Sequence, residues 1–299
     1  MPTTARSNLL GATALAVLLA TGTGCSSDSG RTGSDSKVLE GLGALADDSS
    51  ANPVAYLDVA KARELSKGYE EGLGSIGQPG GILSGYQPGP WGEALKVTQI
   101  DTSVDTESAS RWRGSFDVEG ITAELKSNGF QQTGDDETWT KSGSRGMSLR
   151  VTKQELSYTY TGTSMAAVNP KNGASLGDKK EYQRVAECLG DVYRADFSAL
   201  TTAKPVHLTA LGQQAATAAK NTEILCLVAK DEKTADRAVA KLRSVVAEEA
   251  PRFDGTKVTV EKGDQSVVRA VVPDTGKQRP GRLILSDLEL WTAITDSGL

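Results

Sequence analysis

The sequence contains few of the residues that catalytic and cofactor sites commonly use. Among its 299 residues there are one histidine, three cysteines and three methionines, and aromatic side chains make up only 5%. No P-loop, GxGxxG or HExxH pattern occurs, and no Cys or His cluster has the spacing of a zinc site. We therefore expect no cofactor and no bound metal.

Basic clusters and long apolar runs are also absent. The formal net charge is -5, and Lys and Arg are not concentrated in any one stretch. A nucleic-acid-binding protein normally carries a basic patch, so nucleic acid is not an expected partner. The apolar run from Leu9 to Ala20 is shorter than the roughly 20 residues of a transmembrane helix. No later stretch approaches that length.

The N-terminus, MPTTARSNLLGATALAVLLATGTGCSSDSG, is the most informative part of the sequence. Arg6 precedes the apolar run, and Gly22, Thr23 and Gly24 lead to Cys25. This arrangement resembles the signal peptide and lipobox of exported bacterial lipoproteins of the actinobacterial type, although a leucine is usual at the position of Gly22. The resemblance implies cleavage before Cys25 and attachment of a diacylglycerol to its thiol. The alternative is an ordinary secretory signal with a cysteine nearby.

These features predict a lipid-anchored protein on the extracytoplasmic face of the cell membrane. Residues 1–24 are the expected signal peptide, and 25–37 comprise the lipidated cysteine and a flexible tether. The tether sequence, SSDSGRTGSDSK, has almost no apolar side chain, which is typical of a flexible linker. The lipid bilayer, reached through acylated Cys25, is therefore the first expected partner, and attached fatty acid such as palmitate is expected.

The two other cysteines predict a disulfide. If Cys25 carries lipid, Cys188 and Cys226 remain as an even pair in an exported protein, and such pairs usually form a bridge. The alternative is two free, buried thiols.

Strand signals occur in pairs more often than they alternate with helices. The sequence therefore predicts an α+β fold of antiparallel sheets with helices packed on them. Helices are expected at 117–128, 179–195 and 233–250. Both halves of the chain read strand, helix, strand, strand, which suggests two similar halves. The expected domains are 38–163 and 179–299, joined by a linker at 164–178 that is rich in Ser, Gly, Asn and Lys.

The run GTSMA at 162–166 matches the residues around the nucleophile of subtilisin-like serine proteases. In that family a histidine precedes the serine and accepts its proton. Here the one histidine, His207, follows Ser164, and Asn169-Pro170 limits any helix to about one turn. We interpret GTSMA as a chance match and expect no enzyme. For His207 we expect an ordinary position on a strand.

Aromatic residues are scarce enough to consider one by one. Tyr86 and Trp91 lie in a Gly- and Pro-rich loop, and Trp112 lies between Arg111 and Arg113. Because aromatic residues and arginine dominate binding hot spots, Tyr86, Trp91 and Trp112 are the candidate partner-binding residues. The alternative is that they are buried packing residues.

The sequence as a whole predicts a non-catalytic binding or accessory lipoprotein of the cell envelope. Its further partner would be an envelope protein or a cell-wall component. Two alternatives remain open. One is a small-molecule or lipid carrier with an apolar pocket between the halves. The other is a hydrolase whose site no motif reveals.

Overall fold

The computed structural model describes residues 36–48, 52–67, 73–80, 89–134, 137–143, 146–200, 204–215, 217, 220–274 and 278–295. The predicted signal peptide, Cys25, most of the tether and Tyr86 lie outside these residues. Statements below concern the described residues alone.

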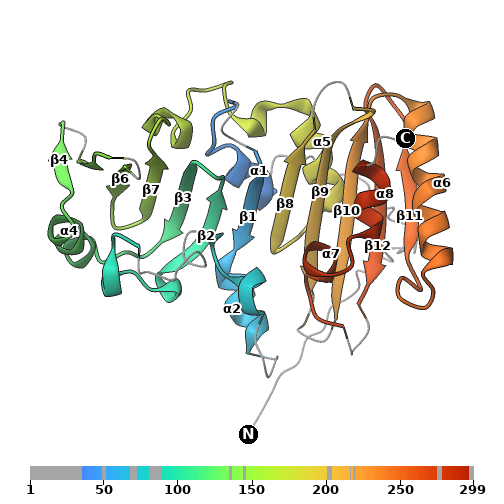
Figure 1. The fold of residues 1–299 in the computed structure, drawn as a ribbon, viewed down its shortest axis with the longest axis horizontal. Coiled ribbons are helices and arrows are strands. Elements are labelled where there is room, and N and C mark those ends of the chain that lie inside the picture. The colour runs from blue at the N-terminus through green and yellow to red at the C-terminus, as the bar shows by residue number, and fades with distance from the viewer. Residues whose placement is uncertain are drawn as a thin grey trace, which may run out of the picture. The chain divides into compact units, whose positions relative to one another are not determined.

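The described strands form one twelve-stranded antiparallel sheet in the order β11-β12-β10-β9-β8-β1-β2-β3-β7-β6-β5-β4 (Figure 1). The predicted α+β class with antiparallel pairing is therefore confirmed. The strands are β1 (Val54–Asp58), β2 (Ile100–Asp105), β3 (Ala109–Gly114), β4 (Gln131–Thr133), β5 (Thr138–Lys141), β6 (Met147–Val151), β7 (Glu155–Tyr160), β8 (Arg194–Ala199), β9 (Val206–Ala215), β10 (Asn221–Ala229), β11 (Lys257–Glu261) and β12 (Ser266–Pro273).

The helices of the described residues are mostly short. The α-helices are α1 (Lys37–Leu42), α2 (Val59–Ser66), α4 (Val118–Ser127), α5 (Lys180–Leu189), α6 (Glu232–Glu248), α7 (Arg282–Leu285) and α8 (Glu289–Thr295). The 3-10 helices are η2 (Gly74–Gly77), η3 (Gly92–Ala94), η4 (Val97–Gln99), η5 (Met165–Val168) and η6 (Leu176–Asp178). Every helix in this part of the chain is too short or too polar to cross a bilayer.

The helices expected at 117–128 and 233–250 begin at side-chain caps in the structure. Asp117 accepts a hydrogen bond from the Gly120 amide at 3.0 Å and begins α4, and Asp231 accepts from Thr234 at the start of α6. The helix expected at 179–195 is shorter in the structure. It ends at Leu189 because Gly190 adopts a φ of 71°, a conformation that favours glycine and stops the helical hydrogen-bond pattern.

Both halves of the sheet use the same connection around a helix. In the second half β10 leads through α6 to the edge strand β11, and β12 returns to pair with β10. In the first half β3 leads through α4 to the edge strand β4, and β5, β6 and β7 return until β7 pairs with β3. The strand-helix-strand-strand order is thus present in the second half and extended by two strands in the first.

The two halves join where β1 pairs with β8, so that Tyr56 lies opposite Ala195. Residues 164–178, at the predicted linker, contain η5 and η6 and pack closely. Val168 and Leu176 are buried, and Ala46 forms a β-bridge with Ser175. The described residues, from 36 to 295, form one compact unit.

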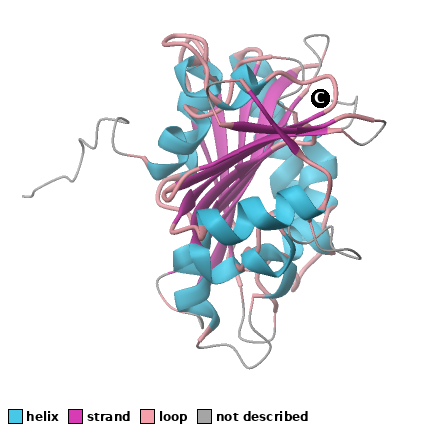
Figure 2. Ribbon diagram, turned by 90° about the vertical axis from the view of Figure 1, so that its left-hand side faces the viewer, coloured by secondary structure: helices cyan, strands magenta, loops and turns pink. Residues whose placement is uncertain are grey.

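Helices cover both faces of the sheet (Figure 2). Helices α1 and α5 pack on one face against alternate residues of the central strands, such as Tyr56, Phe197 and Ile224. On the opposite face α2 and α4 cover the first half, and α6, α7 and α8 cover the second. The period of two along each strand sends successive side chains to these two faces.

Candidate functional site

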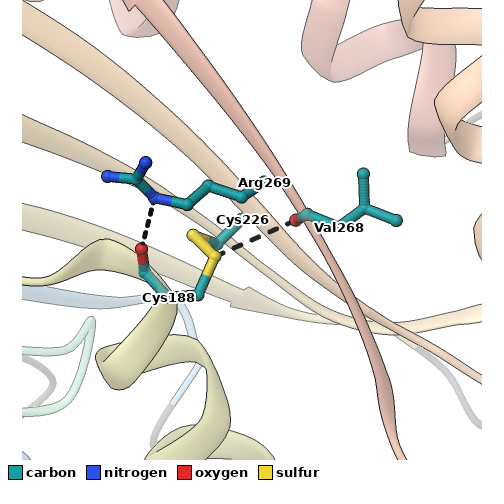
Figure 3. The surroundings of a disulfide bond; sticks show 4 residues. All are labelled: Cys188, Cys226, Val268 and Arg269. Carbon is teal, nitrogen blue, oxygen red and sulfur yellow. Dashed lines mark hydrogen bonds between the residues drawn. A yellow bond between two sulfur atoms is a disulfide. The ribbon is translucent and has the colours of Figure 1, made fainter. Parts of the chain in front are cut away.

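The predicted disulfide between Cys188 and Cys226 is confirmed. It joins α5 to β10, with the two Cα atoms 6.2 Å apart and a sequence separation of 38 residues. In Figure 3, Arg269 lies beside the bridge, and its Nε donates a 2.7 Å hydrogen bond to the Cys188 carbonyl oxygen. The Sγ atom of Cys188 lies 3.9 Å from the Val268 carbonyl oxygen. The bridge therefore fixes α5 against the central strands on one face of the sheet.

Two of the candidate partner-binding residues meet inside the protein. The ring centroids of Trp91 and Trp112 lie 5.3 Å apart, and Tyr158 lies 5.6 Å and 5.4 Å from them. Trp91 is 5% exposed and Trp112 is fully buried. They therefore pack as internal aromatic residues and offer almost no area to a partner. Tyr86 lies outside the described residues.

Ser164 and His207 are held apart by the sheet topology. Ser164 Oγ accepts a hydrogen bond from the Ala166 amide at 3.2 Å and caps η5. Helix η5 packs near β7, whereas His207 is on β9, five strand positions away and thus at roughly 24 Å. Among the described residues the His207 ring has no hydrogen-bond partner. This geometry gives Ser164 no imidazole to accept its proton.

Charged groups buried in the sheet have internal partners. Trp112 Nε1 donates to Asp105 Oδ1 at 2.7 Å, and burial raises the pKa of Asp105 above its ordinary value. On the same face Arg194 forms two hydrogen bonds with Asp196, at 2.6 and 2.7 Å, and a third with the Ile76 carbonyl oxygen at 3.1 Å.

A second buried carboxyl group holds the C-terminal helices to the sheet. Glu223 Oε1 accepts hydrogen bonds from the amides of Gly281 and Arg282, at 2.9 and 2.8 Å. Its Oε2 accepts from the Leu283 amide at 3.0 Å and from Gln213 Nε2 at 2.9 Å. The segment that begins α7 is thus attached to the first part of β10.

Arg282, which begins α7, also forms ion pairs with two carboxylates. Arg282 Nε donates to Asp274 at 2.8 Å, and Arg282 Nη1 donates to Asp287 at 2.7 Å. Burial, followed by the nearby charge of Asp274, raises the pKa of Glu223 to about 7. Neither Asp105, Glu223 nor Asp274 lines any of the cavities described below.

The feature best suited to bind a ligand is a cleft of about 250 Å³ beneath α1. We call it the α1 cleft. Its floor is formed by β1, β2 and β3, on the face of the sheet that carries α1. Its lining comprises Lys37, Glu40, Gly41, Ala44, Tyr56, Asp101, Thr102, Ser103, Val104, Arg111 and Arg113.

Ion pairs connect the rim of the α1 cleft to its surroundings. Arg113 on β3 pairs with Glu40 on α1, and Lys37 pairs with Asp58 at 2.7 Å. Arg111 Nη2 donates to Glu155 Oε2 on β7 at 2.7 Å. The guanidinium groups are therefore positioned by carboxylates outside the floor of the cleft.

Two residues that line the α1 cleft each have a polar atom that is buried, with almost no accessible surface, and that has no hydrogen-bond partner among the described residues. They are the Tyr56 hydroxyl group and Arg111 Nε. Tyr56 is 1% exposed, and its ring lies directly beneath Gly41. Burial, followed by the charge of Asp58, raises the pKa of Tyr56. Its hydroxyl group therefore keeps its proton at neutral pH and remains a donor.

Sequence reasoning singled out Trp112 but not this cleft. Arg111 and Arg113 alternate with Trp112 along β3, so they face the side of the sheet opposite the tryptophan. This alternation in the sequence could have indicated that the two arginines lie on the face of β3 opposite Trp112. The contribution of Tyr56 could not be inferred, because β1 and β3 are not neighbours in the chain or in the sheet.

Two further cavities differ from the expected apolar pocket between the halves. A cavity of about 250 Å³ with residues from both halves is polar, and its lining includes Lys37, Asp58, Lys61 and Asp191. An open groove of about 420 Å³ lies between α6 and α8. No group of three or more His, Cys, Asp or Glu within the described part of the chain is arranged to hold a metal ion.

Comparison with known proteins gives little further information. No protein-family model matches the chain, and no curated protein matches it significantly. Among solved structures the chain is similar to TP0453 in its crystal form I, with 12% sequence identity and a TM-score of 0.44, over 86% of this chain and 98% of that chain. A likeness this distant supports no functional conclusion.

Proposed function

We propose that this protein is a lipid-anchored, non-catalytic binding protein of the cell envelope, held on the extracytoplasmic face of the membrane through Cys25. The observation that carries the proposal is the disulfide between Cys188 and Cys226. Structural disulfides persist in oxidising compartments and are rare in the cytosol. The bridge therefore supports export, and the lipobox resemblance at residues 22–25 supports anchoring.

The hydrogen bonds of the polar side chains favour a binding function over a catalytic one. Ser164 caps a 3-10 helix, and the carboxyl groups with raised pKa values, Asp105, Glu223 and Asp274, are occupied by internal hydrogen bonds. The α1 cleft, in contrast, is an open hollow of about 250 Å³ lined by both polar and apolar side chains. We infer that the body of the protein recognises a ligand or an envelope component without transforming it.

Metabolic labelling and fractionation test the anchor. Cells that produce the wild-type protein are grown with radioactive palmitate, and the membrane and soluble fractions are compared with those of Cys25→Ala. We expect label and membrane association for the wild type, and loss of label for Cys25→Ala. A Cys188→Ser/Cys226→Ser variant is the matched control, because it changes two cysteines and should still be labelled. A wild-type protein that is unlabelled and found in the cytosol would refute the proposal.

A further inference from the structure

An open groove lies between two helices of the second half. Helix α8 packs against α6 (Figure 1), and the groove between them has a volume of about 420 Å³, within the roughly 300–1,000 Å³ of ligand sites. We call it the α6–α8 groove. Its lining includes Lys241, Val245, Glu248 and Glu249 on and just after α6, and Leu288 and Glu289 where α8 begins.

The shape of the α6–α8 groove suits a helix better than a small molecule. Along α6 the lining runs from Lys241 to Glu249, which is roughly 12 Å along the helix axis. That length matches about two turns of a second helix laid in the groove. Grooves of this kind receive the apolar face of an amphipathic helix.

Two exposed leucines lie at this groove. Leu288 lines it and is 44% exposed, and Leu285, which precedes Ser286 of the lining, is 61% exposed. Among the described residues one other large apolar side chain is exposed, Tyr160 on β7 in the first half of the sheet. Exposed apolar area is unfavourable in water, and its concentration beside a groove marks a contact surface. The occupant must therefore present apolar side chains.

One end of the groove has an excess of negative charge. Glu248, Glu249 and Glu289 line this end. A single guanidinium, that of Arg252, pairs with two of them, Glu249 at 3.3 Å and Glu289. Glu248 accepts a hydrogen bond from a hydroxyl group of α6 but has no cationic partner among the described residues. The lining lysine, Lys241, lies about two helical turns away.

The position of the carboxylates on α6 adds to this negative potential. Glu248 is the last residue of α6 and Glu249 is its C-cap, and the last turn contains no basic residue. Because the C-terminus of a helix carries a partial negative charge, carboxylates there oppose helix stability. Residues that break a local rule of stability are typical of functional surfaces. The acidic end therefore favours a cationic occupant.

We propose that the α6–α8 groove binds a basic amphipathic helix of a partner protein, with its apolar face against Leu285 and Leu288 and its lysine or arginine side chains at the acidic end. The assignment rests on the proposed binding function and names the chemistry of its partner. A second copy of this chain would bring the same acidic end to the groove, and an anionic bilayer would be repelled. A cationic helix satisfies the apolar and the charged parts of the surface together.

A labelled model helix tests the proposal. The full chain in a zwitterionic detergent is titrated with a fluorescent helical peptide of leucine and lysine, and fluorescence anisotropy is measured against protein-free detergent. We expect saturable binding of one peptide per protein, weakened severalfold when salt screens the charges. The same peptide with glutamate in place of lysine should bind about tenfold more weakly, because it carries the charge of the groove.

Two variants localise the binding. Leu288→Ser removes an exposed apolar contact and should weaken the affinity for the leucine–lysine peptide about tenfold. Glu248→Gln removes the carboxylate that has no cationic partner and should weaken it about threefold. The matched controls are Tyr160→Ser on β7 and Glu119→Gln on α4, which change the same kinds of exposed group in the first half of the chain. Their affinities should equal that of the wild type.

Carbodiimide coupling gives the position of the peptide directly. This reagent joins a lysine of the bound peptide to a carboxylate in contact with it, and mass spectrometry identifies the carboxylate. We expect coupling to Glu248 or Glu249 in the wild type, and its loss in Leu288→Ser at the same peptide concentration. Coupling spread evenly over the exposed carboxylates, Glu119 included, would overturn the proposal.

Other occupants of the groove give different results. In the Cys25→Ala background, which lacks the lipid, binding to phosphatidylglycerol vesicles that Leu288→Ser abolishes would assign the groove to the membrane. A wild-type dimer in sedimentation that Leu288→Ser dissociates would assign it to a second copy. Either result overturns the proposal, as does equal peptide binding by the wild type and both groove variants. Thermal melting verifies that each variant folds.

Palmitate labelling keeps this proposal separate from the anchor. Leu288→Ser should lose peptide binding and retain the label at Cys25. A labelled wild type that does not bind the peptide overturns the groove alone, and an unlabelled wild type that binds it refutes the anchor alone.

Discussion

Trp112 Nε1 on β3 donates a hydrogen bond of 2.7 Å to Asp105 Oδ1 on the neighbouring strand β2. Trp112 is fully buried and Asp105 is 8% exposed, so the donor and acceptor satisfy each other away from water. Trp91 and Tyr158 pack against the same indole ring. This pair therefore couples the aromatic cluster to the strands that carry the α1 cleft on their other face.

Loss of the indole N–H should destabilise the fold. Trp112→Phe removes the donor to Asp105 and part of the aromatic packing, and we expect the free energy of unfolding to fall by about 3 kcal/mol. Urea denaturation followed by circular dichroism measures the change. Trp291→Phe is the control, because Trp291 is only partly buried and packs at the edge of another cluster. An equal loss in the two variants would contradict the importance of the Trp112–Asp105 pair.

Burial of Asp105 predicts a specific pH dependence. Its pKa is raised in the folded protein, chiefly by desolvation, so the folded state binds more protons than the unfolded state above the ordinary value of 3.8. The contribution of Asp105 to the free energy of unfolding should therefore fall as the pH rises from that value to the raised one. Asp105→Asn keeps an oxygen acceptor for Trp112 and should flatten this part of the stability profile. An unchanged profile in urea titrations would contradict the assignment.

The carboxyl group of Glu223 should control the attachment of the C-terminal helices. Glu223→Ala leaves the amides of Gly281, Arg282 and Leu283 without their acceptor, and we expect a loss of about 3 kcal/mol. Hydrogen exchange should increase first in α7 and α8. Glu107→Ala, in the exposed turn between β2 and β3, is the control. Uniform exchange across the sheet in place of a local increase would argue against this attachment.

The pKa of Glu223 gives the same region a second test. Its folded pKa of about 7 exceeds its ordinary pKa of 4.5, so the stability contribution of this group is greatest below pH 4.5 and is lost as the pH rises to about 7. Hydrogen exchange of α7 and α8, corrected for its intrinsic pH dependence, should report weaker protection at pH 7.5 than at pH 5. Stronger protection at pH 7.5 would reverse the sign of the shift and reject the prediction.

Reduction of the disulfide should lower stability substantially. The bridge closes a loop defined by a separation of 38 residues, which corresponds to about 4 kcal/mol in the chain-entropy description. Urea midpoints for the native protein and the Cys188→Ser/Cys226→Ser variant measure the difference. Mass spectrometry of unreduced peptides verifies the bridge in the wild type. Identical midpoints would show that the loop is already constrained in the unfolded chain.

Ser164 should behave as a capping residue. A fluorophosphonate probe, which labels activated serines, should leave Ser164 unmodified. Ser164→Ala should reduce the free energy of unfolding by about 1 kcal/mol or less, because it removes the hydrogen bond from the Ala166 amide. Stoichiometric labelling of Ser164 would instead identify a nucleophile and overturn our interpretation of GTSMA.

Local sequence signals identified the regular elements well. Asp117 and Asp231 cap the helices expected at 117–128 and 233–250, because a side-chain carboxylate next to free amides acts within a few residues. The helix expected at 179–195 extends past the observed end at Leu189, because the apolar pattern continues through Val192 and Tyr193. Gly190 ends the helix, and these two side chains are buried in the short segment between α5 and β8.

The buried tryptophans and the α1 cleft could not be predicted from local sequence patterns. Trp91 and Trp112 are separated by a long stretch of sequence, and only folding shows that they meet in the core. The α1 cleft combines side chains from α1, β1, β2 and β3, and its unpartnered donors are a property of burial. Neither composition nor periodicity reports which buried donor lacks an acceptor.

The sequence alone determined the α+β class, the antiparallel pairing, the helices near 117–128 and 233–250 and the pairing of Cys188 with Cys226. Each depends on local periodicity or, for the bridge, on there being only one remaining pair. The tertiary structure decided that the strands of both halves form one sheet, that the tryptophans are buried and that Tyr56 and Arg111 share a cleft. These outcomes depend on contacts between residues far apart in the chain, whose energies arise only when packing excludes water from both partners.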